Sequence, residues 1–388
     1  MTLGTNLPAT SLLAKKAQAL VPLIDEHAGY GDENGRLAPE VVEAFHRDGL
    51  YEMWVPEVLG GSELMPLDAL EVISLAAYGD ASAGWVLMAA ALEIGTAGSY
   101  LGDSAVAELW GDDRHPVIGG QGTKPGSAVP TEGGYLLSGS WGFASGLLHG
   151  SHTHSLAIIE TTGEPRIFVV PVEQAQLLGN WDVMGLRGTG SVDYSMDSVF
   201  VPEEYTHFAF TEEPVRGGPV YKLGVIAFAE ICHSGWAMGV GRRILDEIAV
   251  YARGKAGTPN ARTDGPAFAT DYAKAEATYR SAAALVREAW ADVHASLEQG
   301  ERLSVRQGTL VRLALNHMTA SLFEVANFAY LAGGTTALRE GTMQRLMRDV
   351  HAGTQHITSG PGALHNEGLE LLGMAEGKKW ILLDLVDA

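Results

Sequence analysis

The chain has 388 residues, of which 26 are Lys or Arg and 47 are Asp or Glu, and its net charge is −21. A surface with this excess of acidic groups repels nucleic-acid phosphates and anionic membrane surfaces, so we expect neither as a partner. The length and a hydrophobic content of 46% allow two or three domains with sizeable cores.

The single cysteine, Cys232, cannot form an intrachain disulfide, which is typical of proteins in a reducing cytoplasm. It follows the apolar run 226–231, so a buried core residue is favoured over a nucleophile. The N-terminus has no charged-then-apolar signal pattern, and the apolar runs are shorter than the ~20 residues that span a bilayer. We therefore expect a cytoplasmic protein without membrane spans.

Helical spacing of apolar residues predicts helices through residues 1–115, with Pro39 at the start of the second. Further helices are predicted over 67–78 and 82–100. The residue pattern changes in the middle of the chain. Five short segments rich in β-branched and aromatic residues are separated by Gly, Pro and Asp, as in a small antiparallel barrel or sandwich. They are 117–121, 134–142, 154–160, 166–171 and 191–201.

Residues 203–219 are predicted to be a linker, and the remainder is helical again. Apolar residues from Tyr279 to Leu297 and from Val311 to Ala329 step by three and four, which is typical of long packed helices in a four-helix bundle. We therefore predict a helical domain over 1–115, a β domain over 116–210 and a helical bundle over 211–388. This order differs from the alternation of a doubly wound nucleotide-binding fold.

The glycine-rich run 119–126, which reads GGQGTKPG, fits neither of the common phosphate-binding loops. A strand is predicted after it, so no helix N-terminus would meet a phosphate. His149, His152 and His154 lie close together, but there is no HExxH motif and no second thiol to complete a zinc site. A non-heme iron site with two of these histidines and a carboxylate remains an open alternative, although no metal is expected.

Three spaced motifs carry a family resemblance. Residues 133–146 read GGYLLSGSWGFASG, residues 181–191 read WDVMGLRGTGS, and residues 344–356 read QRLMRDVHAGTQH. In this order they resemble the acyl-CoA dehydrogenase superfamily, and the first is most similar to its class D flavin-dependent monooxygenases. The resemblance covers essentially the whole chain. It implies a mainly α fold with a central β domain and a C-terminal four-helix bundle, assembled as a homotetramer.

The dehydrogenases of this family carry a glutamate before a Gly-Thr pair, where it abstracts the substrate α-proton. Ala352 stands at this position and cannot accept a proton. The class D enzymes resemble the chain in having a histidine just downstream, here His356. That resemblance implies reduced flavin, FMN or FAD, delivered by a separate reductase. It also implies reaction with O2 through a flavin C4a-hydroperoxide.

By the same resemblance, Ser145 is expected to donate near flavin N5, and His356 to stabilise the oxygen being transferred. A histidine suits that role because its pKa lies near neutrality. Further flavin contacts are expected from Gln121, Thr123 and Phe143, and from Arg262, whose planar guanidinium suits a phosphate of a neighbouring subunit's flavin.

The segment 82–100 is expected to form a wall of the substrate pocket. Trp85, Met88, Glu93 and His356 are the candidate substrate contacts, and an aromatic wall favours a flat aromatic or heteroaromatic molecule of indole or phenol type. Basic residues do not cluster near these motifs, which disfavours a CoA ester. Two alternatives remain at this stage: an acyl-CoA dehydrogenase or flavin oxidase, and a non-catalytic protein that keeps the fold.

Overall fold

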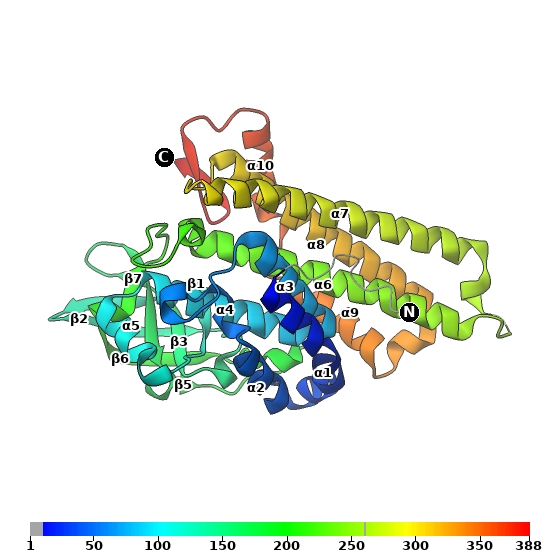
Figure 1. Cartoon of the computed structure of the whole chain (residues 1–388), viewed down its shortest axis with the longest axis horizontal. Helices are drawn as coiled ribbons and strands as arrows, with labels where there is room; N and C mark the ends of the chain where they lie inside the picture. Colours follow the sequence, from blue (N-terminus) through cyan, green and yellow to red (C-terminus); the bar gives the residue numbers. More distant parts are fainter. Residues whose placement is uncertain (1–10, 260) are drawn as a thin grey trace.

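The computed structural model describes residues 11–259 and 261–388, except for the side chains of Asp113 and Arg262. Helices come first, then a sheet, then long helices (Figure 1). The N-terminal helices are α1 (Leu12–Asn34), α2 (Pro39–Asp48), α3 (Pro66–Gly79), α4 (Ala81–Tyr100) and α5 (Asp103–Leu109). The C-terminal helices are α6 (Gly224–Lys255), α7 (Pro266–Glu298), α8 (Val305–Gly333), α9 (Thr342–Gly353) and α10 (Leu364–Leu371).

Local sequence explains where several of these helices begin and end. Pro39, Pro66 and Pro266 occupy first-turn positions, where a missing N–H costs nothing. Ser304 and Gln307 form a reciprocal capping box at the start of α8. Gly35 ends α1 in the left-handed conformation (φ 67°), which glycine adopts without a Cβ penalty.

The sheet has seven strands in the order β5-β6-β2-β1-β3-β4-β7. Their bounds are β1 (Ile118–Thr131), β2 (Gly134–Trp141), β3 (His152–Ile159), β4 (Pro165–Pro171), β5 (Gln176–Leu177), β6 (Tyr194–Pro202) and β7 (Thr206–Phe208). The predicted mainly α fold with a central β domain is confirmed. A purely antiparallel pairing was wrong, because β1 and β3 run parallel while the other pairs are antiparallel.

Two further elements differ from the sequence prediction. The predicted linker 203–219 contains β7, which pairs with β4 and extends the sheet by one strand. A C-terminal hairpin of β8 (Lys378–Ile381) and β9 (Asp384–Asp387) was not predicted. Figure 1 shows this hairpin beside α10, at the end of the bundle where α7 ends and α8 begins.

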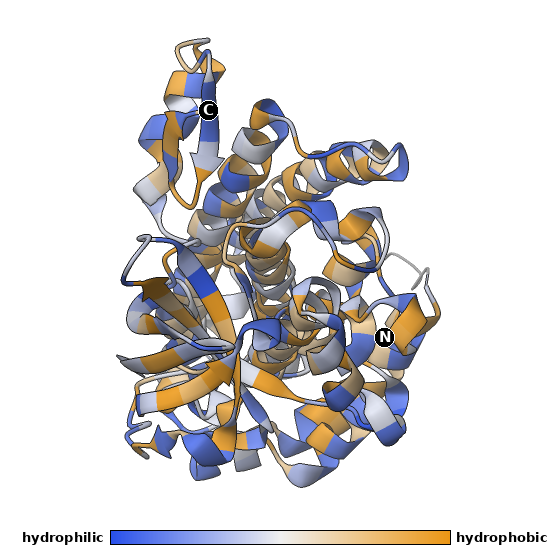
Figure 2. Ribbon diagram, turned by 90° about the vertical axis from the view of Figure 1, so that its left-hand side faces the viewer, coloured by the Kyte–Doolittle hydropathy of each residue, from blue (hydrophilic) through white to orange (hydrophobic). Residues whose placement is uncertain are grey.

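The N-terminal helices and the bundle share one continuous apolar core, which includes Ile73 of α3, Val86 of α4, Ile244 of α6 and Met318 of α8. The sheet has a second core around Trp141, whose indole stacks on Tyr194 at 5.2 Å. Figure 2 views the molecule from the sheet side, with the long helices seen end on behind it. The sheet therefore caps one end of a helical body.

Two helical stretches, Ala81–Tyr100 and Pro219–Lys255, are long and apolar enough to cross a membrane by length and composition. Polar residues such as Glu93 and Glu230 interrupt both stretches, so their uninterrupted apolar runs are short, as expected. In addition, 94% and 83% of their most apolar windows are buried inside the protein. Cys232 lies in the second stretch and is buried, as predicted. Both stretches serve as core helices here.

Buried carboxyl groups join the layers. Asp349 of α9 accepts a hydrogen bond from the Leu186 N–H at 2.6 Å, and burial raises the pKa of Asp349 to about 7. In the bundle, Glu230 pairs with Arg312 at 3.0 Å, and burial raises the pKa values of Glu230 and Glu367 to about 7. These groups favour the protonated form in the folded chain.

The raised pKa of Asp349 gives stability a pH dependence. Between the ordinary carboxyl pKa near 4 and about 7, the folded chain keeps a proton that the unfolded chain has lost. The free energy of unfolding therefore falls as pH rises through this window. Asp349→Asn keeps an oxygen for the Leu186 N–H but cannot ionise, so we expect it to lose less stability than wild type between about pH 5 and about pH 8.

Urea unfolding at the two pH values measures this difference. Asp271→Asn, at an exposed ion pair with Lys274, is the control and should follow wild type. An Asp349→Asn variant with the same pH dependence as wild type would contradict the assignment.

Candidate functional site

Ser145 lies in the segment that follows β2, where the chain leaves the sheet. Its Oγ accepts hydrogen bonds from Trp85 Nε1 and from Ser191 Oγ, each at 3.0 Å. Thr189 Oγ1 lies 2.7 Å from Ser191 Oγ and continues the chain of hydroxyls. Since Ser145 accepts both bonds, its own hydroxyl hydrogen is free to donate. This matches the role expected of it at a flavin ring nitrogen.

Three other predicted flavin contacts lie close by in the sheet. Gln121 and Thr123 are on β1, the strand that pairs with β2, and Phe143 follows β2. Gln121 Nε2 donates to Thr123 Oγ1 at 2.5 Å, at the point where the pairing of β1 with β3 shifts register. Phe143 is held at a positive φ of 62°, its N–H donates to Asp193 Oδ1, and its ring is 71% exposed. Met184, in the turn that precedes β6, is 59% exposed.

These residues fit a flat ring system with polar edges. An exposed phenylalanine leaves about 1.5–3 kcal/mol of burial unrealised. Amide and hydroxyl groups of Gln121 and Thr123 stand on the strand next to Ser145, which forms an isolated bridge with Gly120. Arg262 begins a short helical turn, η9 (Arg262–Asp264), and its side chain lies outside the described part of the chain.

His356 lies in the turn after α9. One side chain, that of Trp85, contacts both His356 and Ser145. Trp85, which donates to Ser145, presents its ring to His356 at a centroid distance of 5.8 Å. His356 Nδ1 accepts from the Thr358 N–H at 3.4 Å and lies 2.9 Å from Thr358 Oγ1. With Nδ1 as acceptor, the neutral ring carries its proton on Nε2. Ser145, Trp85 and His356 are thus brought together as predicted residues of one site.

A second histidine, His233 of α6, completes this cluster and was missed by the sequence reasoning. Its ring stacks on that of His356 at 3.9 Å and meets Trp85 at 5.0 Å. Trp236, one turn along α6, contacts Trp85 at 5.2 Å. A polar side chain within the apolar run around Cys232 is the signal that could have indicated it.

Burial keeps both imidazoles neutral. It lowers the pKa of His356 to about 4, and it lowers the pKa of His233 well below the ordinary value, helped by His356 itself. His233 Nδ1 is buried without a hydrogen-bond partner among the described residues. Two stacked rings in an apolar setting cannot both carry charge, so the pair offers neutral N–H and N groups.

Helix α4 packs against this cluster through Trp85. Trp85, Met88 and Glu93 are all buried. The Met88 carbonyl accepts a hydrogen bond from the Cys232 thiol at 3.3 Å, which links α4 to α6. Burial raises the pKa of Glu93 well above its ordinary range.

The position of the missing base lies at the end of α9. Ala352 is half-buried against the helical core, and a Cβ on the following Gly353 would lie 2.2 Å from Trp236. Alanine leaves this position without a base, and the buried carboxyl of Glu230 on α6 is bound to Arg312.

His149, His152 and His154 are close in sequence, but their side chains do not meet at one metal site. His149 accepts from the Leu37 N–H at 3.2 Å, His152 pairs with Ser151, and His154 is buried. Among the described residues, no group of three or more His, Cys, Asp or Glu side chains could hold a metal ion.

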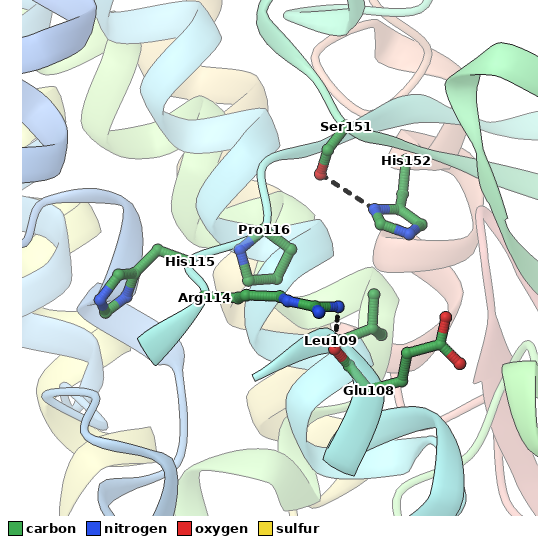
Figure 3. Close-up of a pocket in the computed structure, with 7 residues that line it drawn as sticks. All are labelled: Glu108, Leu109, Arg114, His115, Pro116, Ser151 and His152. Atoms are coloured by element: carbon green, nitrogen blue, oxygen red, sulfur yellow. Dashed lines mark hydrogen bonds between the residues drawn. The ribbon is translucent and has the colours of Figure 1, made fainter. Parts of the chain in front are cut away.

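A surface cleft of about 330 Å³ lies between α5 and the start of the sheet (Figure 3). Its polar groups bind one another: Arg114 donates to the Glu108 carbonyl, and Ser151 lies 2.9 Å from His152 Nδ1. None of the predicted site residues lines it, so it is separate from the cluster around Trp85.

The comparisons with known proteins agree with this geometry. A family model described as acyl-CoA dehydrogenase, C-terminal domain, matches residues 231–360. An indole-3-acetate monooxygenase of Pseudomonas putida is 31% identical over 94% of this chain and 96% of its own length. The flavin-dependent monooxygenase oxygenase subunit HsaA of Mycobacterium tuberculosis is 26% identical over 91% and 94%. The structure of XiaF from a Streptomyces species, in complex with FADH2 and glycerol, superposes with a TM-score of 0.85 at 21% identity, over 93% and 95%.

The fold and the site define a protein of the acyl-CoA dehydrogenase superfamily. Within it, the chain belongs to the flavin-dependent monooxygenases of two-component systems. This confirms the predicted family, and it favours a monooxygenase over a dehydrogenase or a non-catalytic protein of the same fold.

The close approach of Gly353 to Trp236 can be tested. Gly353→Ala places a methyl group inside the indole ring's volume, so Trp236 must move, and we expect a loss of about 1–3 kcal/mol in the free energy of unfolding. Gly368→Ala, in α10 with open space around it, is the matched control and should stabilise the chain by about 0.5–1 kcal/mol. Equal effects of the two substitutions in urea unfolding would refute the contact.

Proposed function

We propose that the chain is the oxygenase component of a two-component monooxygenase that hydroxylates a small aromatic or heteroaromatic molecule with O2 and reduced flavin. One observation carries the proposal: the Ser145 hydroxyl and the neutral His356 imidazole meet on either side of Trp85, beside a base position occupied by alanine. The site supplies hydrogen-bond donors where a dehydrogenase supplies a base.

The residues that would hold the flavin are Gln121, Thr123, Phe143, Ser145 and Arg262. When bound, reduced flavin supplies the electrons with which O2 is cleaved, so that one oxygen atom enters the substrate and the other leaves as water. The free hydroxyl hydrogen of Ser145 would hold a ring nitrogen of the flavin, and the Phe143 ring would cover part of its face.

His356 would act through its Nε2 proton. Thr358 holds Nδ1 as an acceptor, which fixes the proton on Nε2, and the low pKa of about 4 keeps the ring neutral at working pH. A neutral N–H can donate a hydrogen bond to the oxygen being transferred and stabilise the charge that develops on it as the O–O bond breaks. The stacked His233 ring would position His356 for this task.

The buried wall of α4 would exclude water from the reaction and contact the substrate through Trp85, Met88 and Glu93. Exclusion of water prevents loss of the activated oxygen as hydrogen peroxide. The relatives named for indole-3-acetate and for an oxygenase subunit support an aromatic substrate and a separate reductase that delivers the flavin.

The same proposal includes a homotetramer in the cytoplasm. Leu331 of α8 and Leu338 after it are 72% and 63% exposed, and apolar groups of this size favour packing against other copies of the chain. The flavin bound is FAD or FMN. XiaF, crystallised with FADH2, supports FAD.

The role of His356 can be tested by coupling. With a reductase, O2 and indole, we expect the wild type to form about one hydroxylated product for each O2 consumed. His356→Ala removes the Nε2 proton, so O2 consumption should continue while product falls at least about tenfold and hydrogen peroxide replaces it. The measurement is product, peroxide and O2 in the same reaction.

His351→Ala is the control, because that ring packs on Phe323 on the far side of α9 and should leave coupling unchanged. Unchanged product yield in His356→Ala would remove His356 from the mechanism. A wild type that neither consumes O2 with reduced flavin nor forms product would refute the proposed function itself.

A further inference from the structure

Glu93 is a buried acid without a cation. It is 6% exposed on α4, and its Oε2 has no hydrogen-bond partner among the described residues. Burial raises its pKa, and burial, with a smaller contribution from the nearby Glu93, raises the pKa values of Cys232 on α6 and Tyr194 on β6. An unpaired buried carboxyl costs stability, so its retention needs a use.

The crossing of α4 and α6 sets the position of Glu93 relative to α6. Ala81 contacts Trp236, Trp85 contacts His233, and the Met88 carbonyl contacts Cys232, so the two helices run antiparallel. One further turn along α4 and back along α6 brings Glu93 level with Ala229.

Small, half-buried side chains lie at this crossing. Ala89 is the one residue of α4 that is not buried, and it lies one turn before Glu93 and one turn after Trp85. On α6, Val225 and Ala229 are half-buried on the face that continues to His233. These small residues therefore lie between the Trp85–His233–His356 cluster at one end and Glu93 at the other.

The facing segments of α4 and α6 carry no basic side chain. Neither α4 nor residues 224–241 of α6 contain Lys or Arg, and the stacked histidines are neutral. A carboxyl group can accept a hydrogen bond from an N–H or O–H donor, and it can also donate one when protonated. A substrate carboxylate would find no cation here and would face Glu93.

We propose that Glu93 is a specificity-determining residue that binds the ring N–H or phenolic O–H of an uncharged aromatic substrate, with the ring lying between α4 and α6. This inference rests on the proposed function, and it separates the preferred substrate from aromatic acids such as indole-3-acetate. The far edge of the ring then points toward His356, where oxygen is inserted.

Matched ligands test it directly. Indole and 1-benzothiophene share a shape but differ in the N–H, and phenol and toluene differ in the O–H. Binding is measured by calorimetry without O2, on the protein saturated with reduced flavin. We expect wild type to bind the N–H or O–H member of at least one pair about tenfold or more tightly, and indole more tightly than indole-3-acetate or tryptamine.

The variants locate the effect at residue 93. Glu93→Gln keeps an acceptor and should keep most of the preference. Glu93→Leu should abolish it by weakening indole binding, while 1-benzothiophene binds equally well or better. Glu93→Leu should also raise the Tm of the flavin-free protein, because it removes a buried unpaired acid. Ala229→Leu adds bulk on the half-buried face of α6 and should weaken both members of each pair equally.

Three results would overturn the proposal: no preference in wild type for either N–H or O–H ligand, a preference that survives in Glu93→Leu, or tighter binding of indole-3-acetate or tryptamine than of indole. If Glu93→Leu does not fold, the Glu93→Gln and Ala229→Leu results decide. Failure to bind reduced flavin in wild type would instead count against the proposed function.

Discussion

The site depends on one buried junction, where α9 lies directly on the turn that precedes β6. A Cβ on Gly185 would lie 2.0 Å from the Arg348 carbonyl, so only glycine permits this approach. The Leu186 N–H donates to the buried Asp349 carboxyl within the same junction, and Arg348 continues outward to Asp32 of α1. The sheet, the bundle and the N-terminal helices are therefore joined at one point.

The two predicted catalytic groups take their relative position from this junction. The turn after Leu186 carries Ser191, which donates to Ser145, and α9 ends at the loop that carries His356. Trp85 spans the remaining gap from α4, whose N-cap Asp80 pairs with Arg345 of α9. Each group is thus held by a different layer, and displacement of α9 would separate them.

Much of this arrangement was predictable because the motifs lie at the junction itself. The runs 133–146, 181–191 and 344–356 contain Ser145, the Gly185 turn and His356, so their joint presence identified the fold and supplied the predicted site residues. His233 was not predictable in the same way, because a single histidine in an apolar helix carries no motif. Its role emerges only from the packing of α6 against α4 and α9.

Other elements of the fold that the sequence did not predict have local physical causes. β7 has three residues, too few for an alternating pattern, and exists because β4 offers it an edge. The parallel pairing of β1 with β3 depends on tertiary contacts that strand composition does not encode. The division at 115/116 and 210/211 stays a prediction, since the N-terminal helices and the bundle share one core.

Two of the buried polar atoms without a partner lie on the helices that meet at the candidate site. Glu93 Oε2 and His233 Nδ1 are buried without partners among the described residues, in a protein whose helices are otherwise densely packed. Such groups lower stability, and proteins accept that cost mainly where a ligand completes the hydrogen bonds.

Isotope labelling tests the central claim, oxygen insertion in place of proton abstraction, most directly. The enzyme is given a flavin reductase, indole and ¹⁸O₂, and the product is examined by mass spectrometry. We predict that the product gains one ¹⁸O atom from O2 and none when the label is in water. Label arriving from water, or dehydrogenation of an acyl-CoA thioester without oxygen insertion, would contradict the account.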